Sequence, residues 1–539
     1  MKASVHKRLY NWHSLTGLCS TVLLVALCLT ALPAIFIKDI SQWLTPVETI
    51  TPIFKASHSN IDSNSSMATP STQVPGNTLD TWINTADAQL NLAGQEFHIR
   101  SNGEFSPYTL WMSQQDMFKA FVLDEEGVFK EHNSASAAKI LAEVHHNFLL
   151  PDPYGEYLVG LLGLAMLALV FMGVLLHKKW KTEKTQLRKH RSRRLLLSDL
   201  HKVLGLWLLP FHIFVSYTGA TLGLGSLLII VAAISAFNGD QDAAIAAALG
   251  KEPTMSQQQC SMQSPQNMTQ NANQHWQDKY GENYITDIEI HGWLDCNAQI
   301  TIASAIPGYL LASNALTYSL TTGKLINEID WIPSGFGERW YALLGPLHFG
   351  TYAGYASQWL FFVSAILLAI MMVSGMLLWL NKQDTPIAKS LFIKSLTAGC
   401  MGISFASAML LLVALLQNLN VTTINTSYDP LFYKGVYGFS FLFAAVICLL
   451  KLNLWKLVSY TTANILLVGA ATHLYAFQTI GSTLTTNIIL LLSAAVFVAL
   501  PHYSIFKTFA DADLSNSDLS DSNAINPDLP DTSEASSLS

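Results

Sequence analysis

The chain has 539 residues, of which half are hydrophobic and only 12% are charged, and its mean hydropathy is +0.31. This composition is too apolar for an ordinary soluble protein of that length. The formal net charge of −7 gives no sign of the basic surface that nucleic acid requires, so we expect no nucleic-acid partner.

Eight apolar stretches are long enough to cross a bilayer, whose hydrocarbon core takes about 20 residues of helix. They lie at 14–37, 156–176, 203–236, 356–380, 392–417, 435–452, 459–478 and 486–508. The first follows a basic N-terminus but exceeds the apolar length of a cleaved signal peptide, which indicates an uncleaved signal-anchor helix. The sequence therefore predicts a polytopic α-helical membrane protein embedded in a lipid bilayer.

Lysine and arginine are concentrated on the short connecting segments, above all in HKKWKTEKTQLRKHRSRR over 177–194. Because basic loops stay on the cytoplasmic side, both termini are predicted to lie inside and both long loops outside. Each long loop contains a strand, a turn with glycine and a return strand, FKAFVLDEEGVF (118–129) and LTYSLTTGKLI (316–326). The second loop adds strand-like runs at 284–290 and 299–303.

The chain is thus predicted to divide into seven parts. In order they are a first membrane helix (1–37), an outer module (38–155) with a flexible lead-in at 57–77, helices two and three with a basic loop (156–236), a second outer module (237–355), helix four (356–380), a second four-helix membrane unit (392–508) and a disordered acidic tail (509–539). The tail is rich in Ser and Asp, a composition typical of disorder.

Two of the six cysteines, Cys260 and Cys296, share the second outer loop. In an oxidising compartment they are candidates for a disulfide. The other four lie in membrane helices, where cysteine is usually a small apolar filler. The chain has no CxxC motif, which argues against a cysteine metal site, and no CxxCH motif for covalent haem.

A repeat relates the first and third membrane helices. Each has a histidine, a glycine four residues later and a threonine seventeen residues later: His13, Gly17 and Thr30, then His201, Gly205 and Thr218. The second and fourth helices repeat as well, because His146 precedes Gly173 by 27 residues and His348 precedes Gly375 by the same number. Both copies enter the membrane in the same direction, so the sequence predicts a bundle with a pseudo-two-fold axis along the membrane normal.

The repeated histidines are the strongest functional candidates, because an ionisable side chain in a membrane helix is costly. His13 and His201 are expected near the cytoplasmic face, and His146 and His348 near the outer face. Two equivalent imidazoles on a shared axis suit the axial ligation of haem iron. Alternatives are a proton relay and hydrogen bonds across the bundle. The nearby glycines either make room for a cofactor or serve tight helix packing.

His212 stands eleven residues after His201, about three helical turns further on, and therefore on nearly the same face. Its equivalent in the first copy is Leu24, so it has no repeat partner. It is a candidate to bridge the two sites, to replace a ligand, or to form a hydrogen bond to a haem propionate or a backbone carbonyl. A satisfied core histidine is the alternative.

Four segments together resemble a known family. They are KRLYNWHSLTGLCSTVLLVALCLTA, VHHNFLLPDPYGEYLVGLLGLAMLALVFMGVLL, DLHKVLGLWLLPFHIFVSYTGA and PLHFGTYAGYASQWLFFVSAILLAIMMVSGMLLW. In this order they are similar to the helices of PepSY-associated transmembrane proteins, over about residues 1–382. The loop pieces ending LDEEG and LTTGK resemble the outer PepSY modules of that family. Helices five to eight fall outside the resemblance.

The resemblance implies an iron-regulated protein of the bacterial inner membrane with large periplasmic loops. Some members are ferric-siderophore reductases, which implies two b haems and His13, His146, His201 and His348 as their ligands. One departure is that His145 and His146 stand together. The 27-residue spacing favours His146, whereas the look of VHHNFLL favours His145, which we retain as the alternative.

The expected reaction is one-electron reduction of a ferric siderophore or other ferric chelate at the outer face. The chain has no G-x-G-x-x-G or P-loop motif, so the electrons are expected from a cytoplasmic reductant or a membrane quinol. Two rival interpretations are a non-redox, membrane-held PepSY module that binds or regulates peptidases, and a transporter of metal or chelate.

Overall fold

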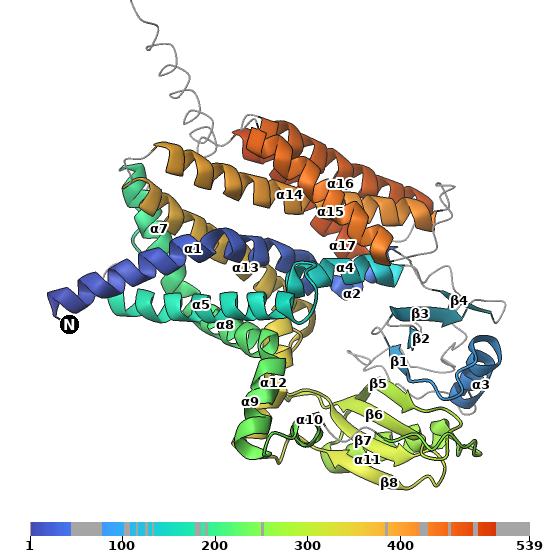
Figure 1. Ribbon diagram of the computed structural model, residues 1–539. Coiled ribbons are helices and arrows are strands. Elements are labelled where there is room, and N and C mark those ends of the chain that lie inside the picture. The colour runs from blue at the N-terminus through green and yellow to red at the C-terminus, as the bar shows by residue number, and fades with distance from the viewer. Residues whose placement is uncertain are drawn as a thin grey trace, which may run out of the picture.

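A computed structural model describes most of the chain (Figure 1). The described residues are 2–44, 78–101, 108–114, 117–123, 128–131, 134–177, 180, 185–188, 192–249, 253–382, 386–419, 430–450, 454–477 and 483–502. The expected flexible lead-in at 57–77, most of the basic loop and the acidic tail lie outside these ranges.

Seven helices of the described residues are long and apolar enough to cross a membrane. They are α1 (Ala3–Ile35), α5 (Tyr154–Leu176), α13 (Gly354–Leu380), α14 (Pro386–Asn418), α15 (Pro430–Leu450), α16 (Trp455–Phe477) and α17 (Leu484–Ala499), which is followed by the short η3 (Leu500–His502). Two further helices, α7 (Arg193–Trp207) and α8 (Leu209–Gly223), meet at an angle of 71° and are together long and apolar enough for an eighth span if the bent pair crosses as one. The chain is a polytopic helical membrane protein, as predicted.

The third predicted span, 203–236, is not one continuous helix. Pro210 lies in the first turn of α8, and a proline both lacks the N–H that a continuing helix needs and disfavours helical geometry in the residue before it. The chain breaks there at Leu208 and breaks again at Leu224, before α9 (Gly225–Ala236). A further helix, α10 (Gln241–Leu249), leads towards the second loop.

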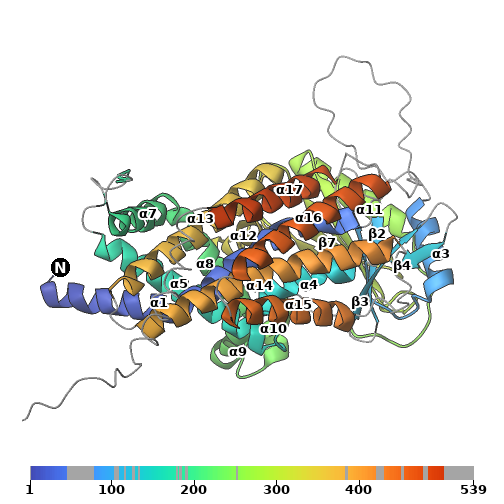
Figure 2. The same ribbon diagram turned by 90° about the horizontal axis from the view of Figure 1, so that it is seen from above.

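Helices α1, α5, α7, α8 and α13 form one bundle, and α14 to α17 form a second unit beside it (Figures 1 and 2). Two shorter helices, α2 (Ile37–Leu44) and α4 (Ser134–Asn147), pack into the core of the second unit. Trp43 of α2 stacks on His473 with 4.8 Å between ring centroids and donates a 2.9 Å hydrogen bond to Asn487. The second unit therefore supports α4, a helix that matters for the site described below.

The two long loops, each of which we had predicted to form an outer module, pair with each other in one antiparallel sheet, a contact that we had not predicted. Its strand order is β4-β3-β2-β1-β5-β6-β7-β8. The first loop supplies β1 (Phe97–Ser101), β2 (Tyr108–Gln114), β3 (Met117–Leu123) and β4 (Phe129–Glu131), and the second supplies β5 (Tyr284–His291), β6 (Gln299–Ala305), β7 (Asn314–Ser319) and β8 (Leu325–Ile329). The order is symmetric about the β1–β5 pair, so the repeat seen in the helices extends to the sheet.

Helices α3 (Thr78–Leu90) and α11 (Pro265–Tyr280) close one face of the sheet with a shared apolar core. Along β1 and β5 the core residues alternate with polar ones, as the two-residue period of a strand requires. The sheet lies beyond one end of the membrane helices, on the side away from the N-terminus (Figure 1). We call this the sheet end of the bundle and the other the N-terminal end.

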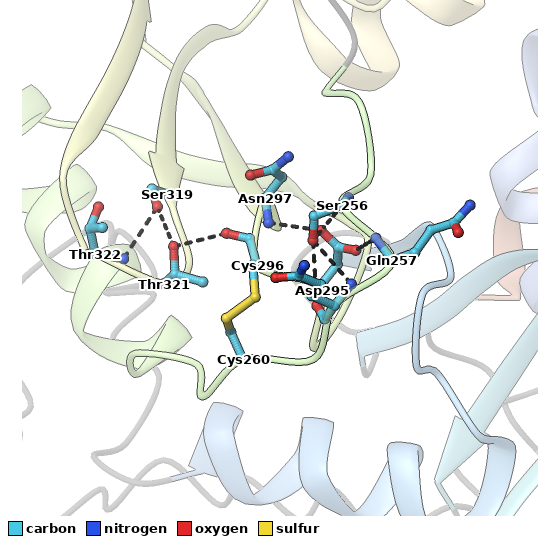
Figure 3. Close-up of a disulfide and its surroundings, with 10 residues drawn as sticks. Ser256, Gln257, Cys260, Asp295, Cys296, Asn297, Ser319, Thr321 and Thr322 are labelled. Atoms are coloured by element: carbon cyan, nitrogen blue, oxygen red, sulfur yellow. Dashed lines mark hydrogen bonds between the residues drawn. A yellow bond between two sulfur atoms is a disulfide. The ribbon is translucent and has the colours of Figure 1, made fainter.

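Cys260 and Cys296 form a disulfide at the edge of the second loop's part of the sheet (Figure 3). The neighbouring Asp295 carboxylate accepts hydrogen bonds from three backbone N–H groups and one hydroxyl, those of Ser256, Gln257 and Asn297. Burial acts to raise the pKa of Asp295, but these donors outweigh it and hold the pKa below its ordinary value. The disulfide and this carboxylate together fix the segment that enters α11.

Candidate functional site: two histidine pairs in the bundle

Four of the predicted histidines meet as two pairs of rings. At the N-terminal end, His13 of α1 and His201 of α7 have ring centroids 6.2 Å apart. At the sheet end, His348 of α12 (Phe336–Phe349) faces His145 of α4 with centroids 6.4 Å apart. An imidazole nitrogen lies about 2 Å from a metal ion that it binds, so two rings on opposite sides of one ion have centroids about 6 Å apart. Both pairs have this spacing.

The ring opposite His348 is that of His145, the alternative in our prediction, and not that of His146, which we had preferred. Successive residues of a helix point about 100° apart, so the two cannot face the same way. The His146 side chain is 54% exposed, and its Nε2 lies 3.1 Å from a Glu156 carboxylate oxygen. Counted from the facing histidine to the glycine, the first copy is one residue longer: Gly173 follows His145 by 28 residues, whereas Gly375 follows His348 by 27.

The repeated threonines hold the pair at the sheet end. Thr218 Oγ1 lies 2.9 Å from His348 Nδ1, and Thr30 Oγ1 lies 3.2 Å from His145 Nδ1. Each hydroxyl donates its own hydrogen to a backbone carbonyl one turn earlier, of Phe214 or Leu27. Each therefore accepts from Nδ1–H, and the Nδ1–H of His145 is shared with the carbonyl of Leu27, 3.1 Å away. This leaves the Nε2 lone pair of both rings available as a ligand.

At the N-terminal end, a backbone carbonyl in place of a threonine accepts the Nδ1–H of His201. His201 Nδ1 donates a 2.9 Å hydrogen bond to the carbonyl of Met371 in α13. The equivalent residue for His13 is Leu169 of α5, whose backbone interacts with the imidazole, but His13 Nδ1 is buried without a hydrogen-bond partner. Hydrogen bonds to Nδ1 of this kind are typical of histidines that bind metal through Nε2.

The glycines at the end of each 27-residue spacing make room for the N-terminal pair. A Cβ at Gly375 would lie 2.7 Å from Cε1 and 2.8 Å from Nδ1 of His201, closer than real Cβ contacts, whereas one at Gly173 would lie 3.6 Å from Cε1 of His13. Gly173 and Gly375 are equivalent in the repeat, but only Gly173 leaves room for an added methyl group beside its histidine.

We expect Gly375→Ala to displace the His201 ring and to break its bond to Met371. Overpacking of this kind typically costs about 1–3 kcal/mol. Gly173→Ala is the matched control, since its added methyl group fits in ordinary van der Waals contact. Thermal stability of the two purified variants measures the difference. Equal behaviour of both variants would contradict the packing described here.

A cavity of about 1240 Å³ surrounds the N-terminal pair. Its wall includes His13, His201 and both repeated glycines that follow them, Gly17 and Gly205. Most of the other lining side chains are apolar, and three basic residues, Arg194, Lys202 and Lys382, complete the wall. The cavity therefore combines two opposed imidazoles, apolar walls and a source of positive charge.

His212 also lines this cavity. Its side chain is 1% exposed, and its Nε2 is buried without a hydrogen-bond partner. Its ring contacts that of Phe211 with 6.2 Å between centroids, and no ring pair between His212 and another imidazole is formed among the described residues. The structure thus places His212 in the wall of the cavity beside the N-terminal pair, whereas its repeat equivalent, Leu24, is a buried apolar residue.

The sequence identified the four helices and all five histidines described above, but not the hydrogen-bond acceptors of their Nδ1 atoms. The threonines were visible as part of the repeat, so their spacing was a signal. The carbonyl of Met371 carried no signal, because any residue offers a backbone acceptor.

This architecture defines a class of protein: a multi-pass membrane bundle with two histidine pairs on a pseudo-two-fold axis, joined to an eight-stranded sheet. The chain belongs to the family with a PepSY-associated TM region, which matches residues 10–382. It is 27% identical over 307 residues to the uncharacterized protein PA4219 of Pseudomonas aeruginosa, an alignment that covers 51% of this chain and 72% of the relative. The expected family is confirmed.

Proposed function

We propose that this protein is a dihaem membrane cytochrome that passes electrons across the bacterial inner membrane to a ferric chelate. The observation that carries the proposal is the pair of opposed imidazoles at each end of the bundle, both at the centroid spacing of axial ligands. A proton relay has no need for two rings at this spacing at each end.

The residues present fit b-type haem. His13 and His201 would hold one group in the cavity, where Arg194, Lys202 and Lys382 offer charge to its carboxylates. His145 and His348 would hold the second. Bound haem supplies one-electron redox chemistry at the iron. The chain's own contribution is to fix three of the four imidazoles, those of His145, His201 and His348, through their Nδ1 atoms and to exclude water with apolar walls.

Two histidines on each iron leave no open coordination position, which suits electron transfer rather than oxygen chemistry. The two pairs are separated by 17 residues of α1, from His13 to Thr30, or about 25 Å of helix. This distance is most of the hydrocarbon thickness of a bilayer. The two haems would therefore serve as an electron path from one side of the membrane to the other.

The substrate in this proposal is a ferric siderophore or a similar chelate on the periplasmic side, where the sheet would lie. One electron converts ferric to ferrous iron, and hard oxygen ligands hold ferrous iron less well. The donor would be a cytoplasmic reductant or a membrane quinol. This one-electron step releases iron from the chelate without breaking the organic ligand.

Proteoliposomes test the activity directly. A reductant is enclosed, a ferric hydroxamate chelate is added outside, and ferrous iron is followed with a coloured ferrous-specific chelator. We expect ferrous iron to form with the haem-loaded protein and not with His348→Ala. A protein whose haems become reduced but whose rate of iron reduction equals that of protein-free liposomes would contradict the proposal.

A further inference from the structure

A cluster of histidines and carboxylates lies where the two halves of the sheet join. In the β1–β5 pair, Ile99 opposes Ile288 and both are buried in the core. Because side chains alternate along a strand, His98 and the Glu289 that it opposes lie on the other face. They come from different loops of the chain, 191 residues apart in sequence.

Two more residues complete the cluster, Glu96 just before β1 and His291 at the end of β5. His98 Nε2 lies 3.7 Å from oxygens of both Glu96 and Glu289. His291 lies 2.9 Å from a Glu289 oxygen through Nε2 and 3.7 Å from a Glu96 oxygen through Nδ1. Ligands about 2.0–2.2 Å from one ion are about 3–4 Å apart. Glu96, Glu289 and His291 can each offer one ligand atom within 4.8 Å of the others, and His98 Nε2 adjoins this group through the two carboxylates.

The other ring nitrogen of His98, Nδ1, is held by a carboxylate. Its Nδ1 lies 3.1 Å from Asp287 Oδ2, and the other oxygen of Asp287 accepts a 3.4 Å hydrogen bond from Arg100. A carboxylate on Nδ1 orients the ring and makes Nε2 a better ligand, as in the carboxylate–histidine–metal arrangement of many metal sites. The His98 side chain is only 14% exposed, so its orientation is set by these partners.

We propose that Glu96, His98, Glu289 and His291 bind one divalent transition-metal ion of borderline softness, such as Zn²⁺ or Fe²⁺. Two imidazoles with two carboxylates suit these ions and not Mg²⁺ or Ca²⁺, which prefer oxygen ligands. The carboxylates of Glu96, Glu289 and Asp287 outnumber the one nearby guanidinium, that of Arg100. The cluster therefore carries excess negative charge and attracts a cation. The ion would join the two halves of the sheet, a role beyond the proposed electron transfer and independent of haem.

The test uses the full-length, haem-loaded protein in detergent, without a polyhistidine tag, dialysed against Zn²⁺ and counted for bound metal. We expect one Zn²⁺ per chain that excess Mg²⁺ does not displace. His98→Ala and His291→Ala should each weaken binding more than tenfold, and Asp287→Asn, which removes only the orienting charge, about 10–100-fold. Haem absorption should not change in any of them.

His275→Ala is the matched control, because His275 also lies beside a carboxylate of the second loop's half of the sheet, 3.4 Å from Glu328. It should bind Zn²⁺ as the unchanged protein does. Absence of stoichiometric Zn²⁺, or retention of it in the double variant His98→Ala/His291→Ala, would overturn the proposal. Loss of Zn²⁺ in His146→Ala instead would assign the ion to the exposed group of His146, Asp152 and Glu156 and would overturn it as well.

Discussion

Replacing His145 with alanine is expected to remove one of the two haems, whereas replacing the adjacent His146 leaves both. His145 faces His348 across the bundle and is anchored by Thr30, whereas His146 points outward to Glu156. An iron that loses one of its two axial imidazoles also loses most of what holds a non-covalent haem. Haem per chain, measured on purified protein, should fall from two to one in His145→Ala.

His348→Ala should reproduce the effect of His145→Ala, because in the proposal the two rings hold the same iron. His146→Ala is the control for both variants, since it removes the same imidazole atoms from α4 as His145→Ala does. If His146→Ala lost a haem while His145→Ala kept both, the pairing described here would be wrong.

Replacing His201 with alanine is expected to stop electron transfer across the membrane while sparing the haem at the sheet end. Without the N-terminal haem, an electron would have to cross about 25 Å more of apolar bundle. The variant should hold one haem per chain, still reducible by dithionite added on the side of the sheet. Reduction from an enclosed donor, however, should fall to the background rate.

The control for this variant is His6→Ala, which changes a half-buried histidine on α1 two turns before His13. It should keep both haems and the full rate of transmembrane reduction. Undiminished reduction from the enclosed donor in His201→Ala would show that electrons reach the sheet end by another route.

Much of the membrane fold was predictable because a bilayer demands long apolar helices, and these stand out in any sequence. The repeat then identified which helices form the bundle. The break at Pro210 was also readable in principle, since a proline ends the helix before it. We had predicted one span there because the apolar run continues unbroken across Pro210.

The union of the two loops into one sheet was not predictable from local patterns. The β1–β5 pair joins residues nearly two hundred positions apart, and no turn sequence specifies such a contact. The preference for His146 over His145 rested on equal spacing to the following glycine. That spacing is a sound guide only if the stretch between them has no insertion, and the stretch from His145, the ring that faces His348, is one residue longer in the first copy.

The central claim is that each histidine pair holds one haem, and an absorption spectrum with haem quantification tests it most directly. Full-length protein, produced with haem supplied and shown to be folded, should contain two b haems per chain. It should show a Soret band and an α band that sharpens on reduction with dithionite, as expected of iron with two imidazole ligands. A folded protein with no Soret band, or with haem that survives removal of both His201 and His348, would contradict it.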